Sequence, residues 1–168
     1  TRVWKRYAVD VFTGVNTLFH ALTQSNTFQK CDFNTLKLTL AGGMPLTQAT
    51  ADAWHTLTHC PITQAYGLTE ASPGVSSCPP DQPFDHTVGY PLKDTEIQIR
   101  NETICGPGEL GEIWVKGPQV MSCYWKNPEL TAATLQNGWL NTGDMGYLDQ
   151  QGRLTVSDRK KDLIIVSG

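Results

Sequence analysis

Residues that could bind a phosphate or a metal ion occur together in the segment QAYGLTE (64–70) of this 168-residue chain. The oxygen atoms of Thr69 and Glu70 are of the kind that Mg²⁺ prefers, and Tyr66 offers an aromatic face on which a base could stack. A solvated loop with a capping threonine accounts equally well for the same residues. On its own, this segment therefore leaves both interpretations open.

The segment AGGMP (41–45) contains two adjacent glycines between an expected strand and an expected helix. Because Gly42 and Gly43 lack side chains, another group can approach the backbone closely here. In open α/β sheets, this end of a strand is where ligands bind. Taken alone, the segment is still explained more simply as an ordinary strand-to-helix turn.

Two further segments contain charged residues that could contact a nucleotide. In GWLNTGD (138–144), the carboxylate of Asp144 could accept hydrogen bonds from a ribose diol, although a surface turn is equally consistent. In SDRKKD (157–162), the charge run is typical of a solvated face. Its position between two strand-like segments also suits a linker or hinge.

A metal site at His55 and His59 is a weaker hypothesis. The two histidines are four residues apart on an expected helix, but no HExxH pattern and no third ligand accompany them. We interpret them as part of a solvated helix face.

The elements that must position these residues alternate between strand and helix in the first 70 residues. We expect a buried strand at 9–15, a helix at 17–24, a strand at 36–40, a helix from Pro45 to about His59 and a strand from 62. Pro45 suits the first turn of its helix, where the missing N–H would be unpaired. This order predicts an α/β fold with a parallel sheet and crossover helices.

The chain changes character after this region. The segment 72–85 is rich in proline, glycine and serine, which predicts a loop or a subdomain boundary. Beyond it we expect strands at 97–99 and 110–115, a short helix at 128–135 capped by Asn127, and a hairpin over 147–156. Short strands separated by frequent turns predict a small antiparallel β-barrel.

Composition excludes several classes of protein. The net charge is −3, which argues against nucleic-acid binding as a main function. Hydrophobic residues make up 39% of the chain, enough for a core, and no apolar run is long enough to span a membrane. The five cysteines form no CxxC pair, so we expect free thiols in a reducing compartment.

Taken together, these segments resemble the adenylate-forming (AMP-binding) acyl-CoA synthetase family over essentially the whole chain. The matching segments, in order, are AGGMP (41–45), QAYGLTE (64–70), VGYPL (88–92), GELGEIWVKGPQVMSCYW (109–126), GWLNTGD (138–144) and SDRKKDLIIVSG (157–168). The runs FTGVNTLFHAL (12–22) and VKGPQVM (115–121) resemble the bacterial long-chain fatty acid–CoA ligases in particular.

The resemblance implies that the chain is an internal fragment, the C-terminal part of the large domain of such an enzyme. Residues 1–75 would be a partial α/β subdomain with the adenine- and magnesium-binding loops. Residues 76–157 would be a distorted antiparallel β-barrel subdomain, and 158–168 a hinge to a C-terminal domain that lies outside the chain.

The implied reaction uses ATP, Mg²⁺ and coenzyme A. A fatty acid carboxylate attacks the α-phosphate of ATP, and the coenzyme A thiol then displaces AMP from the acyl-adenylate. By resemblance, Thr69 would touch the α-phosphate, and Glu70 would hold Mg²⁺. The other implied roles are nucleotide binding by Gly43, Met44, Pro45, Gln64, Ala65, Tyr66, Gly67, Asp144 and Arg159, acyl binding by Gly67, Val88 and Gly89, and a hinge at Lys161.

Two parts of the family pattern, a phosphate-binding loop and a C-terminal lysine, would lie outside the chain. We therefore expect the fragment alone to be inactive. We also expect a cytoplasmic protein, with peripheral contact with the inner face of the membrane and self-association of the fragment as further options. The alternatives are an AMP-forming ligase for an aromatic acid or an amino acid, and a non-catalytic nucleotide-binding module.

Overall fold

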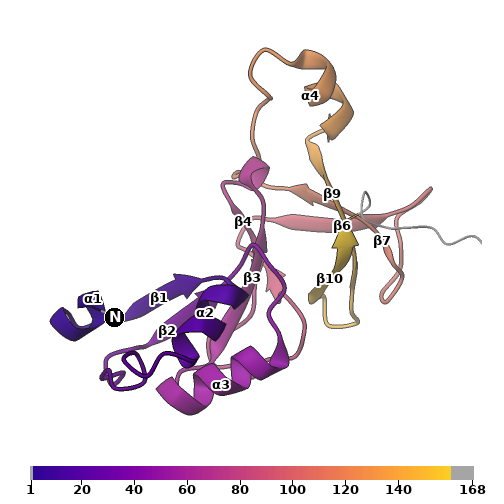
Figure 1. Ribbon diagram of the computed structural model, residues 1–168. Helices are drawn as coiled ribbons and strands as arrows, with labels where there is room; N and C mark the ends of the chain where they lie inside the picture. The colour runs from indigo at the N-terminus through magenta and orange to yellow at the C-terminus, as the bar shows by residue number, and fades with distance from the viewer. Residues whose placement is uncertain (1, 160–168) are drawn as a thin grey trace, which may run out of the picture. The chain divides into compact units, whose positions relative to one another are not determined.

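The computed structural model describes residues 2–159, which divide into two compact units (Figure 1). The first unit contains the described residues up to Tyr66 together with 78–86. The second contains 67–77 and the described residues from Thr87 onward. The chain therefore leaves the first unit directly after Tyr66, returns at Cys78 and leaves again after His86.

The first unit is built on parallel strands. Strand β1 (Val11–Gly14) pairs with β2 (Leu38–Ala41), and β2 pairs with β3 (Ile62–Gly67), both in parallel. Helices α2 (Asn16–Thr23) and α3 (Gln48–Thr58) form the crossovers and pack against each other, while the short α1 (Arg2–Arg6) precedes β1. The predicted parallel sheet with crossover helices is confirmed.

An aromatic cluster forms the core of this unit. Trp54 of α3 is fully buried and stacks on Phe12 of β1, with ring centroids 5.6 Å apart and an interplanar angle of 12°. Phe19 of α2 meets the same indole edge-on at 4.9 Å. The indole N–H donates to Oγ1 of Thr39, at 3.3 Å. This packing fixes both helices against the strands whose ends contain the predicted nucleotide-binding loops.

Two details of the first unit differ from expectation. Helix α3 begins at Gln48 rather than at Pro45, because Oγ1 of Thr47 accepts a hydrogen bond from the Thr50 N–H and caps the helix there. Strand β1 is not buried: Val11 is 53% exposed, and exposure alternates along the strand. Among the described strands, β1 pairs with β2 alone, so one of its edges has no neighbouring strand.

The second unit is dominated by antiparallel strands. The main sheet has the order β10 (Leu154–Arg159), β9 (Trp139–Leu148), β7 (Gly111–Lys116), β6 (Glu96–Arg100), and β8 (Leu135–Gln136) pairs with β9. This sheet is the curled antiparallel half-barrel of the fold (Figure 1). It confirms the predicted change from parallel to antiparallel strands.

The buried face of this sheet is aliphatic. Ile113, Val115, Leu140 and Leu154 are completely buried and come from the three strands β7, β9 and β10. Because side chains alternate between the two faces of a strand, Trp114 of β7 lies on the opposite face from Ile113 and Val115, where it is covered by the guanidinium of Arg100. Leu154 is also tied by its backbone N–H to the Gly89 carbonyl, at 2.8 Å.

The proline-rich segment 72–85 is more ordered than a loop. It contains β4 (Gly74–Ser77), which pairs with β5 (Tyr90–Pro91) in antiparallel fashion. Val75 is fully buried, and Oγ of Ser76 donates to the Val88 carbonyl at 2.8 Å. The prolines stand outside β4, where no ladder N–H is needed, so they do not prevent the strand.

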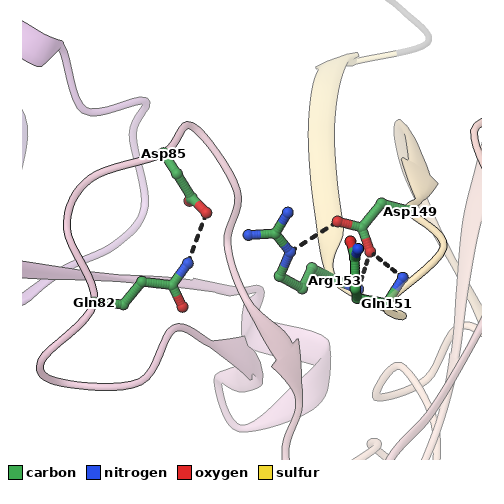
Figure 2. A network of polar contacts seen from close by, with 5 residues as sticks. All are labelled: Gln82, Asp85, Asp149, Gln151 and Arg153. Carbon is green, nitrogen blue, oxygen red and sulfur yellow. Dashed lines mark hydrogen bonds and ion pairs between the residues drawn. The ribbon is translucent and has the colours of Figure 1, made fainter.

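Polar contacts fix two turns, which Figure 2 shows from close by. In the turn between β9 and β10, Oδ1 of Asp149 accepts from the Gln151 and Arg153 backbone N–H groups, and Oδ2 accepts from Nε of Arg153 at 2.8 Å. Partial burial pushes the pKa of Asp149 upward, but these hydrogen bonds and the guanidinium charge together lower it. In the first unit, Nε2 of Gln82 donates to Asp85, at 2.6 Å.

Candidate functional site

The residues predicted to bind the adenine base lie on two adjacent segments of the first unit. Gly43, Met44 and Pro45 follow the end of β2, whereas Gln64, Ala65 and Tyr66 lie within β3. The two segments nearly touch, since a Cβ built on Gly42 would stand 3.3 Å from the Ala65 carbonyl oxygen. These are the carboxyl ends of neighbouring parallel strands, where α/β sheets bind ligands.

Side-chain exposure differs between these two segments. Met44 is 52% exposed, so its thioether is available to a flat ligand. Gln64 is buried and Tyr66 half-buried, and both already interact with other residues. The loop after β2 therefore offers an apolar surface to a ligand. On β3, the side chains of Gln64 and Tyr66 are held by contacts with other residues.

In the second unit, Thr69 and Glu70 lie on the 3₁₀ turn η1 (Thr69–Ala71). The Leu68 N–H donates to the Pro73 carbonyl at 2.9 Å, and the Ala71 N–H donates to the Leu68 carbonyl at 2.9 Å. These backbone bonds hold the turn independently of any side chain. Glu70 is half-buried, whereas Ala71 next to it is fully buried and anchors the turn.

The segment that follows β7 holds Glu70 in two places. The Tyr124 hydroxyl donates to Oε1 of Glu70 at 2.8 Å, and the Met121 N–H donates to the Glu70 carbonyl oxygen at 2.8 Å. Burial raises the pKa of Tyr124, the hydrogen bond to Glu70 and its negative charge raise it further, and a hydrogen bond with Thr134 opposes them. The phenol is therefore a neutral donor at physiological pH.

The donor set around Glu70 fits Mg²⁺ in one particular manner. Over residues 2–159, no group of three or more His, Cys, Asp or Glu side chains could enclose a metal ion. Among the side chains that the structure describes, Glu70 makes no ion pair with a lysine or arginine. A single carboxylate with one oxygen bonded to a neutral phenol suits Mg²⁺ that keeps several waters and is bound mainly by substrate phosphates.

Asp144 lies beside a bulge in β9. Glu112 of β7 is opposite Met145, and Trp114 is opposite Asn141, so three residues of β9 face only one of β7. Gly143, with φ of 73°, makes the turn that this bulge requires. Asn141 accepts from the Gly143 N–H at 2.9 Å, and Thr142 accepts from the Asp144 N–H at 3.1 Å.

The bulge changes which residues are buried around Asp144. Gly143 is exposed, whereas Asp144 is 8% exposed and has further contacts of its own. On the neighbouring strand, Arg159 is the backbone partner of Asp144 in the antiparallel register. The two residues predicted to bind the ribose thus stand directly opposite each other in the sheet, while Lys161 lies outside the described residues.

The residues predicted to bind the acyl group are held by backbone contacts. The Val88 N–H donates to the Leu154 carbonyl at 2.8 Å, and the Gly89 carbonyl accepts from the Leu154 N–H at 2.8 Å. Gly67 lies against Pro73: a Cβ at this position would stand 1.9 Å from the Pro73 carbonyl oxygen. At Gly67, Val88 and Gly89, contacts with other backbone segments therefore fix the course of the chain.

Comparison with known proteins shows which family this architecture belongs to. A family model described as "AMP-binding enzyme" matches residues 1–125. This chain belongs to the AMP-binding enzyme family.

Two relatives illustrate the range of similarity within the AMP-binding enzyme family. The long-chain-fatty-acid–CoA ligase of Haemophilus influenzae is 45% identical over 167 residues, which are 98% of this chain and 30% of that protein. The O-succinylbenzoate coenzyme A synthetase of Bacillus subtilis, solved in complex with ATP and a magnesium ion, is 34% identical with a TM-score of 0.87. That match covers 99% of this chain and 35% of the synthetase.

A third relative has a different activity in its name. The amide bond synthetase McbA of Marinactinospora thermotolerans superposes with a TM-score of 0.90 at 31% identity, over 99% of this chain and 35% of that protein. The chain therefore spans about a third of the length of each of these three AMP-binding relatives. Their shared fold confirms the predicted fold class and the resemblance to the adenylate-forming enzymes.

One residue that contacts the candidate site was not predicted from the sequence. Tyr124 is part of the segment QVMSCYW, which resembles the family, but its chemistry was not considered because Glu70 is 54 positions away. The bulge at 142–144 was missed too, although Gly143 between two polar residues is a signal for one. Both features depend on pairing between distant segments.

Two simpler expectations concern cysteines and membrane spans. All five cysteines are free thiols in the structure, and they lie within its described part. Between residues 2 and 159, no helix has both the length and the apolar character needed to cross a bilayer.

Proposed function

We propose that the whole protein, of which this chain supplies a part, is an AMP-forming long-chain fatty acid–CoA ligase. The observation that supports this most directly is the 45% identity to the Haemophilus influenzae ligase over 98% of this chain. The carboxylate of Glu70, which lies on the turn η1 and is bonded only to the neutral Tyr124 phenol among the described residues, adds a chemical reason. The chain alone is proposed to be inactive.

The proposed reaction has two steps. A carboxylate oxygen of the fatty acid attacks the α-phosphorus of ATP, the bond from that phosphorus to the bridging oxygen breaks, and pyrophosphate leaves. The coenzyme A sulfur then attacks the acyl carbon, AMP leaves with the bond electrons, and the thiol proton passes to solvent. Both steps develop negative charge on oxygen, so the protein must supply hydrogen-bond donors and cations more than a base.

In the first unit, we propose that Gly43, Met44 and Pro45 form one wall of the adenine slot and that Tyr66 forms the other. Gln64 and Ala65 would lie at the edge of the base. The adjacent positions of the loop and of β3 support this assignment, as does the exposed side chain of Met44. A slot of this kind needs a fixed aromatic ring, and β3 supplies the rigid support.

In the second unit, we propose that Thr69 donates to the α-phosphate and that Glu70 binds the Mg²⁺ that accompanies ATP. Mg²⁺ supplies charge neutralisation on the phosphate oxygens. We further propose that Asp144 accepts from the ribose hydroxyls with help from Arg159. Their opposed positions on β9 and β10 support the pairing. Lys161 remains the proposed hinge.

The acyl group is proposed to lie beside Gly67, Val88 and Gly89. The backbone hydrogen bonds of Val88 and Gly89 fix the chain there, and the uncharged residues Gly67, Val88 and Gly89 suit an apolar acyl chain. An aromatic acid is the second candidate, because the 34%-identical Bacillus subtilis synthetase is named for O-succinylbenzoate. An amino acid substrate and a non-catalytic nucleotide-binding module remain as alternatives.

The proposed reaction also indicates where the protein works. ATP and coenzyme A are intracellular substrates, and the five free thiols fit a reducing compartment, so we propose a cytoplasmic protein. A long-chain acid partitions into lipid, which gives a reason for peripheral contact with the inner face of a membrane. Self-association is proposed only for this chain when it is isolated.

The test is an assay of AMP release by the whole protein with ATP, Mg²⁺, coenzyme A and carboxylic acids of increasing chain length. We expect AMP with long-chain acids and its loss in Glu70→Ala, while Glu102→Ala, at an exposed glutamate elsewhere in the second unit, keeps the activity. If AMP is released only with aromatic acids, the proposed substrate is wrong but the proposed mechanism stands. Tight ATP binding with no AMP from any acid would favour the binding module.

A further inference from the structure

The hydrogen bond between Tyr124 and Glu70 links two segments that are far apart in the sequence. The phenol oxygen lies 2.8 Å from Oε1 of Glu70, across 54 positions of the chain. Both residues belong to the second unit. The contact is partly buried, so water competes with it less than at an open surface.

The residues after Tyr124 hold its backbone in place. The Tyr124 N–H donates to Oγ1 of Thr131 at 3.0 Å, and that hydroxyl donates to the Asn127 carbonyl at 2.7 Å. Asn127 in turn caps helix α4 (Pro128–Thr134) by accepting from the Leu130 N–H at 3.0 Å.

Helix α4 is therefore a support for Tyr124 rather than part of the hydrophobic core. None of its seven residues is buried. A helix this short and this exposed gains little from packing, so its capping and side-chain hydrogen bonds must maintain it. The same group of hydrogen bonds fixes the backbone of Tyr124.

A phenol has a particular advantage as the partner of a carboxylate that is to bind a cation. It occupies one oxygen and fixes the rotation of the carboxylate, but it adds no positive charge. A lysine or arginine in the same place would neutralise the carboxylate and repel the cation. In the described range, nothing donates to Oε2 of Glu70, so this oxygen is left for the ligand.

We propose that Tyr124, supported by α4, is a positioning residue that directs Oε2 of Glu70 toward the Mg²⁺ of ATP. This inference rests on the proposed role of Glu70. It goes beyond that role, because it makes the segment 121–134 part of the metal-binding apparatus. The Met121 N–H contributes by fixing the Glu70 backbone at 2.8 Å.

The experiment measures ATP binding to the whole protein by calorimetry, once with saturating Mg²⁺ and once in EDTA, without fatty acid. The ratio of the two affinities is the gain due to Mg²⁺. We expect Tyr124→Phe to reduce this gain about 10-fold and to leave the affinity in EDTA unchanged, since partners of a metal ligand typically have effects of this size. Tyr7→Phe is the matched control, because Tyr7 is exposed and belongs to the first unit.

A double-mutant cycle shows whether Tyr124 acts through Glu70. If it does, Tyr124→Phe has no further effect on the Mg²⁺ gain in a Glu70→Gln background. The proposal is overturned if the two effects add, if Tyr124→Phe keeps the wild-type gain, or if affinity falls equally with and without Mg²⁺. A wild-type protein that shows no Mg²⁺ gain would overturn the proposed function as well, so the two failures can be told apart.

Discussion

Gly67 and Pro73 are in direct backbone contact at the start of the turn that presents Glu70. A Cβ on Gly67 would lie 1.9 Å from the Pro73 carbonyl oxygen, and the same oxygen accepts the Leu68 N–H at 2.9 Å. The chain thus closes a tight loop around η1. A glycine is required here because of the close approach of another backbone segment.

Replacing Gly67 by alanine is expected to open this loop. The clash involves a carbonyl oxygen rather than the end of a flexible side chain, so it is relieved only by moving the backbone. We expect the free energy of unfolding of the whole protein to fall by about 3 kcal/mol in urea denaturation. Nucleotide affinity is expected to fall as well, since Glu70 lies on the displaced turn.

Gly108→Ala is the matched control for this prediction. A Cβ there meets no atom within 4 Å, but φ is 81°, so only backbone strain of about 1 kcal/mol is expected. Equal losses of stability in the two variants would contradict the proposed role of the Gly67–Pro73 contact.

Much of the secondary structure could be predicted from local signals. Asn127 predicted the start of α4 because its side chain caps the helix, and the alternation of Ile97 and Ile99 predicted β6. The start of α3 was predicted wrongly at Pro45, because a proline is compatible with the first turn of a helix. In the structure, the side chain of Thr47 caps the helix, which therefore begins at Gln48. Strand β4 was missed because prolines around it masked a short buried run.

The candidate site was predictable only in part. Family resemblance singled out Glu70 and Asp144, but no spacing rule predicts that Tyr124 reaches Glu70. That contact depends on how η1 meets the segment after β7, which is a property of the folded sheet. Likewise, the bulge that turns Asp144 inward depends on the register between β7 and β9.

Asp149 is expected to make stability depend on pH. Its folded pKa is lowered, so the carboxylate stabilises the folded state above its unfolded pKa of about 3.9. This contribution is lost as the pH falls through the lower, folded value. In Asp149→Asn the turn keeps an acceptor oxygen but loses the charge, and we expect a loss of about 0.5–1 kcal/mol at pH 7.

Urea denaturation at pH 7, at pH 4 and at lower pH measures the free energy of unfolding of the wild type and of Asp149→Asn. The quantity of interest is the difference between these two free energies at each pH. The difference should shrink as the pH falls, because the wild-type carboxylate becomes protonated. Asp81→Asn, at an exposed carboxylate of the first unit, is the control variant. A constant difference for Asp149→Asn would show that its charge has no part in stability.

The proposed ribose contact of Asp144 can be tested with ligands that differ only in the ribose. If the carboxylate accepts from both hydroxyls, the whole protein should bind AMP roughly 10–100-fold more tightly than 2′,3′-dideoxy-AMP, since hydrogen bonds to a charged group are strong. Calorimetry with Asp144→Ala should show weaker AMP binding and unchanged dideoxy-AMP binding, so that the ratio approaches one.

This design separates recognition from structural damage. Asp144 is 8% exposed and contacts other residues, so its removal could also distort β9. Distortion of the strand would weaken both ligands equally and keep the ratio, which would contradict the proposed role. Asp149→Asn removes a carboxylate from the turn that follows the same strand, and it should keep the wild-type ratio. A ratio lost only in the Asp144 variant would therefore identify its carboxylate as the group that recognises the ribose hydroxyls.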